Sequence, residues 1–283
     1  MRKVTVSAVQ MSCSWNISEN IQKAEKLIRK AKAEGAQIIL LQELFETPYF
    51  CQREDYQYFD LAKPKAENQA IRHFSKLAKS LEIVLPISFF ERDNNTCFNS
   101  LVVIDADGQV LDTYRKTHIP DGHSYEEKFY FAPGDTGFKV WQTRYAKIGV
   151  GICWDQWFPE SARCMALMGA ELIFYPTAIG SEPLLGRDSQ GHWQRCIQGH
   201  SGSNLVPIVV SNRIGTETDE TSMTFYGSSF ITNQFGEIIK QADRFSEMIL
   251  VTEIDLETAA ADRRNWGVFR DRRPEHYHKI LEM

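Results

Sequence analysis

Residues 148–175 read IGVGICWDQWFPESARCMALMGAELIFY, and this stretch decides how the chain folds. The apolar run 148–153 predicts a buried strand, the segment 159–168 predicts a helix that Pro159 opens, and 172–175 predicts a second strand. Short, continuous apolar runs are typical of strands that are covered on both faces. The stretch therefore predicts a strand–helix–strand unit of an α/β protein.

Strands and helices alternate along the rest of the chain as well. Outward from this stretch, the patterns predict strands at 4–10, 38–41, 83–89, 208–211 and 249–254, helices at 18–35, 69–81 and 190–203, and hairpins at 100–114 and 227–240. No linker or low-complexity stretch divides the sequence. We therefore expect one domain of mixed α/β architecture over residues 1–283. Its charged and aromatic end, residues 256–283, is expected to pack on the surface or on a neighbouring subunit.

The composition argues against several classes of protein. The chain is 43% hydrophobic and 24% charged, with a net charge of −5, which are ordinary values for a globular protein. It has no Lys/Arg-rich run, so nucleic acid is not an expected partner. No apolar stretch approaches the roughly 18 residues of a membrane span. The six cysteines form no CxxC pair, which predicts a reduced cytoplasmic protein with mostly buried thiols and no zinc site.

Three polar residues stand where predicted strands end, and the first is Cys153. A cysteine between a strand and a helix projects from a sheet edge, and the backbone N–H groups that follow it, here that of Trp154, can form an oxyanion hole. This is the geometry of a catalytic nucleophile. The local pattern alone fits a buried core cysteine equally well.

The other two residues are Glu43 and Lys116. Glu43 ends the strand 38–41 and would lie at the same sheet edge as Cys153 if the strands are parallel, where it could take the thiol proton. Lys116 follows the hairpin and could stabilise the negative oxygen of a tetrahedral intermediate. Each also has a plain structural interpretation, a solvated acid at a strand end and a surface lysine.

The segments that carry these residues resemble a known family. LLQE at 40–43, YRKTHIP at 114–120 and GVGICWD at 149–155 are similar to the three signature segments of the nitrilase superfamily, in the same order of glutamate, lysine and cysteine. The resemblance covers nearly the whole chain. It implies a four-layer αββα sandwich, catalysis by Glu43, Lys116 and Cys153 with neither metal nor organic cofactor, and assembly into a homo-oligomer.

The resemblance extends to one branch of the superfamily, which hydrolyses N-carbamoyl diamines. It implies that Glu127 is a second pocket glutamate that positions the lysine and the substrate, with the adjacent Glu126 as a competing candidate. It also places Tyr49 and Glu182 in the substrate pocket, and we expect Tyr125 to form part of its wall. The expected partner is thus a small ureido or amide molecule whose distal ammonium would bind to a carboxylate or an aromatic face.

Two alternatives remain open at this stage. N-carbamoyl amino acids such as N-carbamoyl-β-alanine, or ω-amides, would need an arginine for their distal carboxylate, and Arg187 and Arg195 follow the predicted pocket residues. A different class, an inactive scaffold or binding subunit, would not require all three signature residues.

Overall fold

The sheets come from all parts of the chain. The computed structural model describes residues 2–181, 186–219 and 222–282. One sheet joins β14 (Met248–Asp255), β1 (Lys3–Gln10) and β2 (Ile38–Leu40), and another joins β3 (Leu85–Asp93), β4 (Thr96–Ile104) and β5 (Val110–Arg115). The largest orders β13 (Ile238–Gln241), β12 (Phe230–Thr232), β9 (Ile208–Ser211), β8 (Leu172–Pro176), β7 (Lys147–Val150) and β6 (Val140–Gln142). The strands β10 (Ile214–Thr218) and β11 (Ser222–Tyr226) form a separate pair.

The helices cover the outside of these sheets. The longer ones are α1 (Ile17–Ala33), α2 (Gln69–Leu81), α4 (Pro159–Leu167), α5 (Gln190–Asn204) and α6 (Leu256–Trp266), while α3 (Glu127–Tyr130) is one turn. Short 3₁₀ turns are η1 (Phe50–Gln52), η2 (Tyr56–Leu61), η3 (Cys153–Trp157), η4 (Pro274–His276) and η5 (His278–Leu281). The predicted helix 18–35 begins one residue earlier, at Ile17, because Asn16 is its N-cap and accepts from the Glu19 amide at 3.2 Å.

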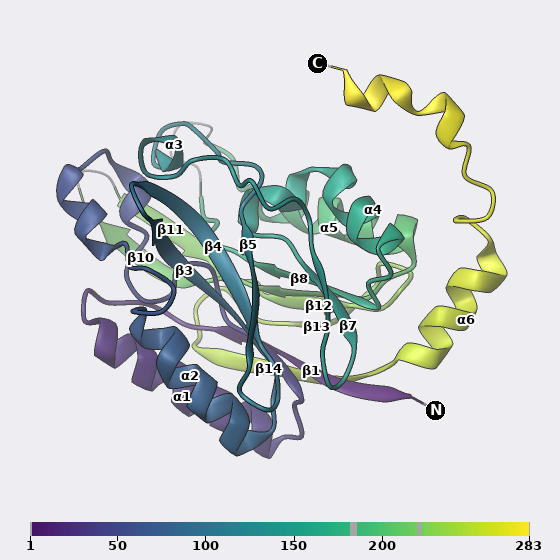
Figure 1. Ribbon diagram of the computed structural model, residues 1–283, viewed down its shortest axis with the longest axis horizontal. Helices are drawn as coiled ribbons and strands as arrows, with labels where there is room; N and C mark the ends of the chain where they lie inside the picture. The colour runs from purple at the N-terminus through teal and green to yellow at the C-terminus, as the bar shows by residue number, and fades with distance from the viewer. Residues whose placement is uncertain (1, 182–185, 220–221, 283) are drawn as a thin grey trace.

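Three apolar clusters define the layers. The first packs α1 and α2 against strands β1 to β4, the second lies between the sheets, and the third packs α4 and α5 against β8 and β9. Figure 1 shows the two helix pairs on opposite sides of the sheets. The prediction of a single-domain mixed α/β fold is confirmed, and the clusters follow the order helices, sheet, sheet, helices.

Successive side chains of β1 point to opposite faces of its sheet and so contribute to two different clusters. In β1, Val4, Val6 and Ala8 face the cluster between the sheets, whereas Val9 contributes to the helix side. A strand with apolar residues on both faces must be covered on both, which explains the continuous apolar runs in the sequence. The parallel pairing of β7 with β8, on either side of α4, confirms the strand–helix–strand unit at residues 148–175, and β9 adds a further parallel strand.

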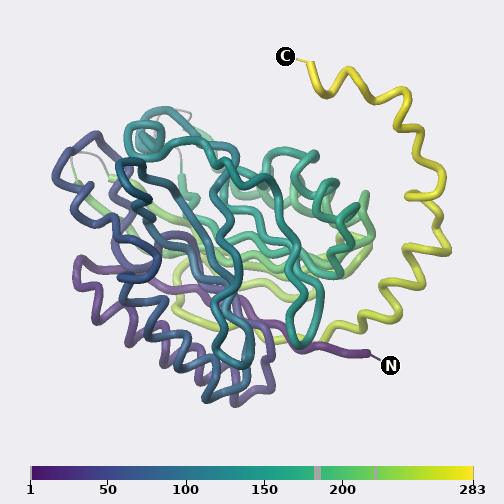
Figure 2. Tube along the Cα trace, viewed as in Figure 1, coloured from purple at the N-terminus to yellow at the C-terminus, as the bar shows by residue number. Residues whose placement is uncertain are grey.

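The carboxyl-terminal segment leaves the body of the molecule. The sequence patterns gave no helix there, yet Asp255 caps α6 by accepting from the amides of Glu257 and Thr258. Leu256 and Ala259 are buried, and the remainder of the segment curves away, as Figure 2 shows. Leu281, near its end, is 87% exposed. The role of this segment stays a prediction.

Two other expectations concern membranes and thiols. Within the described residues, no helix combines the length and apolar character needed to cross a bilayer. All six cysteines are free thiols. Mostly buried thiols were predicted, but this holds only for Cys51 and Cys153, and Cys164 is exposed.

Candidate active site

A strained turn presents Cys153. The residue follows β7 and opens η3, with a φ of 40°, which is rare for a residue with a side chain. The chain enters this turn through Gly151, where a Cβ atom would lie 2.9 Å from the ring of Tyr175. Cys153 is only 4% exposed, and its Sγ lies 3.9 Å from the Ala178 carbonyl oxygen. The turn thus holds the sulfur in an enclosed place at the end of the sheet.

Asp155 fastens that turn from within. Its carboxylate accepts from the Ile152 amide at 2.8 Å and from the Tyr114 hydroxyl at 2.7 Å. It also accepts from the His118 amide at 3.1 Å and contacts His118 Nδ1 at 2.7 Å. A fully buried carboxylate with four partners is well satisfied. The conformation of Cys153 therefore rests on neighbours close in sequence and on the residues around Lys116.

Glu43 and Lys116 meet across two sheets. Glu43 follows β2 and Lys116 follows β5, and Lys116 Nζ donates to Glu43 Oε1 at 2.9 Å. The Glu43 amide donates to the Thr177 carbonyl at 3.3 Å, which ties the end of β2 to the end of β8. Glu43 and Cys153 therefore lie at the same end of two different, stacked sheets, and do not share one sheet edge.

Glu127 completes the buried charge cluster. It begins α3, accepts from Lys116 Nζ at 2.7 Å and accepts from the Tyr49 hydroxyl at 2.6 Å. Glu43 and Lys116 are fully buried, and so is Glu127. The neighbouring Glu126 is partly exposed and makes none of these contacts. Of the two candidate glutamates, the structure places Glu127 beside the lysine.

Burial and charge set the protonation of the cluster. Burial alone would lower the pKa of Lys116, but the carboxylates of Glu127 and Glu43 outweigh it and raise that pKa above its ordinary value. Burial, followed by the Glu43 carboxylate, raises the pKa of the Cys153 thiol well above its ordinary value. The lysine is therefore an ammonium, and the resting thiol keeps its proton until a base removes it.

One oxygen of Glu43 has no partner in the resting site. Oε1 accepts from Lys116 and from Asn99, whereas the buried Oε2 makes no hydrogen bond among the described residues. Buried polar atoms without a partner are uncommon and call for an explanation. Besides burial, the charge of the Glu43 carboxylate raises the pKa of the Cys153 thiol, so the two groups interact. A carboxylate oxygen without a hydrogen bond can then accept the proton of the thiol.

The predicted substrate residues divide into two groups. Tyr49 and Tyr125 are buried, with ring centroids 5.8 Å apart, and the Tyr125 hydroxyl accepts from the Gly180 amide at 3.2 Å. Trp154 follows the nucleophile directly in η3. Glu182, predicted to bind the distal ammonium, lies outside the described residues.

Sequence patterns gave no hint of two buried residues that hold the base. Asn99 in β4 donates from Nδ2 to Glu43 Oε1 at 2.7 Å. Arg213, which follows β9, donates to the backbone oxygens of Glu43 at 2.9 Å and Leu44 at 3.0 Å, and pairs with Glu217. An arginine after an apolar run such as 208–211 is the one signal that could have drawn attention, since a buried guanidinium must be paired.

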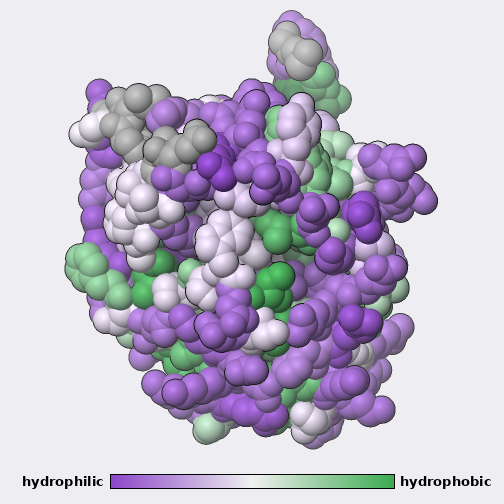
Figure 3. All heavy atoms as spheres, turned by 90° about the vertical axis from the view of Figure 1, so that its left-hand side faces the viewer, coloured by the Kyte–Doolittle hydropathy of each residue, from purple (hydrophilic) through white to green (hydrophobic). Residues whose placement is uncertain are grey.

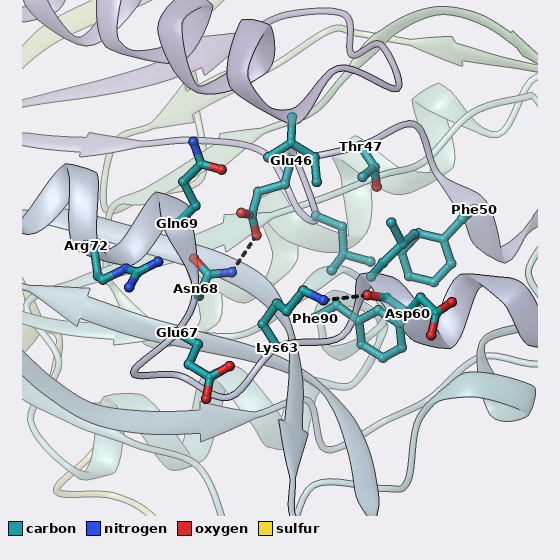
Figure 4. A pocket seen from close by; sticks show the side chains of 13 residues that line it. Glu46, Thr47, Phe50, Asp60, Lys63, Glu67, Asn68, Gln69, Arg72 and Phe90 are labelled. Atoms are coloured by element: carbon teal, nitrogen blue, oxygen red, sulfur yellow. Dashed lines mark hydrogen bonds between the residues drawn. The ribbon is translucent and has the colours of Figure 1, made fainter.

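A separate cavity of about 340 Å³ backs onto the loop between Glu43 and Tyr49. Figure 4 shows Glu46 and Asn68 there, joined by a hydrogen bond of 2.8 Å. Burial raises the pKa of Glu46 to about 7. None of the three signature residues lines this cavity. The surface that Figure 3 presents is largely hydrophilic, in keeping with a reactive cluster that is enclosed.

No cluster of three or more His, Cys, Asp or Glu side chains suited to a metal ion occurs within residues 2–181, 186–219 and 222–282. The groups that gather here, a thiol and an ammonium that binds two carboxylates, suit acyl transfer to sulfur.

Comparison with known proteins defines the class of protein. Residues 5–264 match the carbon–nitrogen hydrolase family, and the chain belongs to this family, the nitrilase superfamily. It is thus an enzyme that hydrolyses carbon–nitrogen bonds of linear amides.

Individual relatives narrow this further. The chain is 57% identical to N-carbamoylputrescine amidase from Arabidopsis thaliana, over 100% of this chain and 96% of that one. It is 53% identical to citrullinase from Francisella tularensis, over 99% of each chain. The crystal structure of a carbon–nitrogen hydrolase from Helicobacter pylori G27 matches with a TM-score of 0.93 at 38% identity, over 99% of both chains.

Proposed function

We propose that the chain hydrolyses N-carbamoylputrescine to putrescine, carbon dioxide and ammonia, with Cys153 as nucleophile, Glu43 as base and Lys116 as oxyanion stabiliser. The observation that carries the proposal is the enclosed cluster itself, in which one oxygen of Glu43 has no partner among the described residues, the lysine binds the other, and the carboxylate, besides burial, raises the pKa of the Cys153 thiol. The identity of 57% with N-carbamoylputrescine amidase over the full chain supports the choice of substrate.

The first half of the reaction forms a carbamoyl-thioester. Glu43 takes the proton of Cys153 through Oε2, and the thiolate attacks the ureido carbonyl carbon. Lys116 and the Trp154 amide stabilise the oxygen that becomes negative, and loss of one such donor commonly costs about 3 kcal/mol of barrier. Glu43 then passes its proton to the departing nitrogen, and putrescine leaves.

The second half restores the enzyme. Water gives a proton to Glu43 and attacks the carbamoyl carbon, the C–S bond breaks, and the proton returns to the sulfur. The carbamate that is released decays to carbon dioxide and ammonia. Glu127 supports both halves as a positioning residue, because it accepts from the same Lys116 Nζ atom that binds Glu43. The site needs neither metal nor organic cofactor for any of these steps.

The charges around the site favour a substrate that ends in an amine. Lys116 is paired with two carboxylates, and Arg213 is paired with Glu217 and with backbone oxygens, so both cations are already engaged. The aromatic rings of Tyr49 and Tyr125 stand beside Glu127 and suit an ammonium better than a carboxylate. Glu182 remains our first candidate for the distal ammonium.

Citrulline is the rival that the comparisons support. It carries the same ureido group on a similar alkyl chain but ends in an amino acid, so it needs a cation for its carboxylate. The identity of 53% with a citrullinase supports citrulline as the alternative substrate. Arg187 lines a cavity of about 430 Å³ together with Phe225, and it is our candidate for that cation.

Ammonia release from matched ureido and amide compounds tests the proposal. We expect the highest kcat/KM with N-carbamoylputrescine and lower values with citrulline, N-carbamoyl-β-alanine and an ω-amide. The Cys153→Ala variant serves as the control for contaminating activity and should release no ammonia. A higher kcat/KM for a carboxylate-bearing compound would reject our choice of substrate, and turnover by the control would reject the nucleophile.

We also propose that the protein forms a homo-oligomer through its carboxyl-terminal segment. Trp266, Ile280 and Leu281 expose large apolar surfaces there, and a groove of about 700 Å³ separates the segment from α4. Light scattering should give a multiple of the chain mass of 32.5 kDa, reduced on deletion of residues 267–283. A monomeric mass for the full chain would contradict the proposal.

A further inference from the structure

Asn99 touches both members of the central ion pair. It lies in β4, is fully buried, and donates from Nδ2 to Glu43 Oε1 at 2.7 Å. Its backbone oxygen accepts from the Lys116 amide at 2.8 Å, at the point where β5 separates from β4. One strand residue thus sets the position of the lysine's backbone and of the glutamate's side chain.

The hydrogen bonds make the two oxygens of Glu43 unequal. Oε1 accepts from an amide and from an ammonium, so its lone pairs are engaged. Oε2 is buried with no partner among the described residues and is the oxygen left to take a proton. Because Asn99 stands in β4, Lys116 follows the neighbouring β5 and both bind Oε1, the two bonds also oppose rotation of the carboxylate about its last torsion.

The chemistry of the amide fixes its orientation. An Asn carbonyl turned toward the Glu43 carboxylate would place two acceptors against each other, so the NH₂ group must face Glu43. The Asn99 Oδ1 atom is then buried without a hydrogen bond in the described structure. Leaving an acceptor unpaired costs free energy, which the protein bears in order to keep the donor on Glu43.

We infer that Asn99 is a positioning residue that fixes Glu43 through Oε1 and thereby reserves Oε2 as the proton acceptor for Cys153. The inference deepens the function proposed above, on which it rests for the role of Glu43. It extends the catalytic set of Glu43, Lys116 and Cys153 to a strand residue that is in contact with two of them.

Other ionisable groups also act on Glu43 and must be kept constant in a test. They are Lys116 after β5, Glu127 in α3, Cys153 in η3, Tyr49 before η1, Cys51 in η1 and Arg213 after β9. Substitution of Asn99 leaves all of these residues in place. A change in the pH profile can therefore be assigned to the loss of the amide donor.

The test is the pH dependence of kcat/KM in Asn99→Asp and Asn99→Ala. Removal of the amide donor destabilises the ionised carboxylate of Glu43, so we expect the ascending limb to move upward by about one pH unit in Asn99→Ala. We expect a larger shift in Asn99→Asp, which adds a like charge with almost no change of shape.

The neighbouring residue offers a matched control. Ser100 is also buried in β4 and donates to a different carboxylate, Glu91 Oε2, at 2.6 Å. Ser100→Ala removes a side-chain hydrogen bond of β4, so it should lower the unfolding midpoint. It should leave the ascending limb of the kcat/KM pH profile unchanged. If both Asn99 variants kept the wild-type limb, or if Ser100→Ala moved it equally, the positioning role would be overturned.

A readout without substrate separates this inference from the proposed function. The rate at which iodoacetamide alkylates Cys153 depends on loss of the thiol proton, whatever the natural substrate is. We expect its pH profile to shift in the Asn99 variants as the kinetic limb does. If the profile shifts while N-carbamoylputrescine is not hydrolysed, only the substrate assignment fails. An unshifted profile overturns the role of Asn99.

Discussion

The two halves of the candidate site are held in different ways. Cys153 opens a local turn, in which the carboxylate of Asp155 accepts from the amide of Ile152, three residues earlier in the chain. The cluster of Glu43, Lys116 and Glu127 is instead held by side chains from separate strands and helices. The nucleophile thus depends on one turn and on the segment around Lys116 that binds Asp155, whereas the base depends on contacts among several strands and helices.

This difference has an energetic side. The turn at Cys153 stores strain in a positive φ and offsets it with four contacts to Asp155. The charged cluster keeps an ammonium between two buried carboxylates, an arrangement in which removal of one partner leaves the others uncompensated. We therefore expect the largest mutational effects in the charged half.

Lys116→Gln should cause the largest combined loss of stability and activity among substitutions in the candidate site. It leaves Glu43 and Glu127 buried without their cation, so we expect a loss of about 3–5 kcal/mol in the free energy of unfolding. The loss of the oxyanion partner should also lower kcat about 100-fold to 1,000-fold. Urea unfolding and single-turnover kinetics measure the two effects.

An exposed ion pair provides the control for this substitution. Arg144 pairs with Glu82 at the surface, where both side chains are more than half exposed. Arg144→Gln should change the unfolding free energy by about 0.5 kcal/mol or less, with unchanged kcat. If both substitutions lowered the unfolding free energy and kcat equally, the buried cluster would contribute no more to stability and catalysis than a surface ion pair.

Asp155→Asn should weaken the nucleophile half to a smaller degree. The amide turns an NH₂ group toward donors that need an acceptor, which we expect to cost about 2–3 kcal/mol of stability. Displacement of the sulfur should lower kcat about tenfold or more, with little change in KM. Unfolding curves and steady-state kinetics test this. If the variant were destabilised but kept a normal kcat, the Asp155 turn would not be required for catalysis.

The smallest effect concerns a histidine behind the nucleophile half. His200 Nδ1 contacts the Tyr175 hydroxyl at 3.4 Å, and Ser161 joins Tyr175 to the Asp155 carbonyl. Burial lowers the pKa of His200 to about 4, so below about pH 6.5 the unfolded chain binds a proton that the folded chain does not. Native stability therefore falls as the pH decreases from about 6.5 to 4.

His200→Asn removes this dependence. Relative to the wild type, we expect the variant to gain roughly 1–2 kcal/mol between pH 7 and pH 5 in chemical unfolding. Glu46, whose pKa burial raises to about 7, gives a slope of the opposite sign, but it is present in both proteins and cancels in the difference. A difference that did not vary with pH would contradict the link between His200 and acid stability.

The sequence predicted the local strand–helix–strand unit around Cys153 better than the long-range contacts of the charged cluster. The patterns at 148–175 correctly predicted β7, α4 and β8, because apolar periodicity and a proline are local signals, but β7 ends at Val150 and the end of the predicted strand, Cys153, lies in η3. Glu43 and Lys116 each follow a strand, but only the resemblance of their segments to the nitrilase signatures singled them out. The separate sheets of Glu43 and Cys153 were not, because sheet stacking is set by contacts far apart in the chain.

Other parts of the site had no local signal at all. Asn99 stands next to Ser100 in the polar half of the β4 segment, and nothing in the sequence distinguishes it from a solvent-facing strand residue. The choice between Glu126 and Glu127 required a helix of one turn, too short for periodicity to reveal. The helix α6 was missed because its charged and aromatic composition hides a narrow apolar face at Leu256 and Ala259.

The most direct measurement is peptide-mapped mass spectrometry of the enzyme quenched during turnover of N-carbamoylputrescine. We expect a carbamoyl group on the peptide that contains Cys153, at a level that rises when release is slowed by cooling, and none on the other five cysteines. Turnover with the Cys153 peptide unmodified at every quench time, or with the group on another cysteine, would contradict a site built around this sulfur.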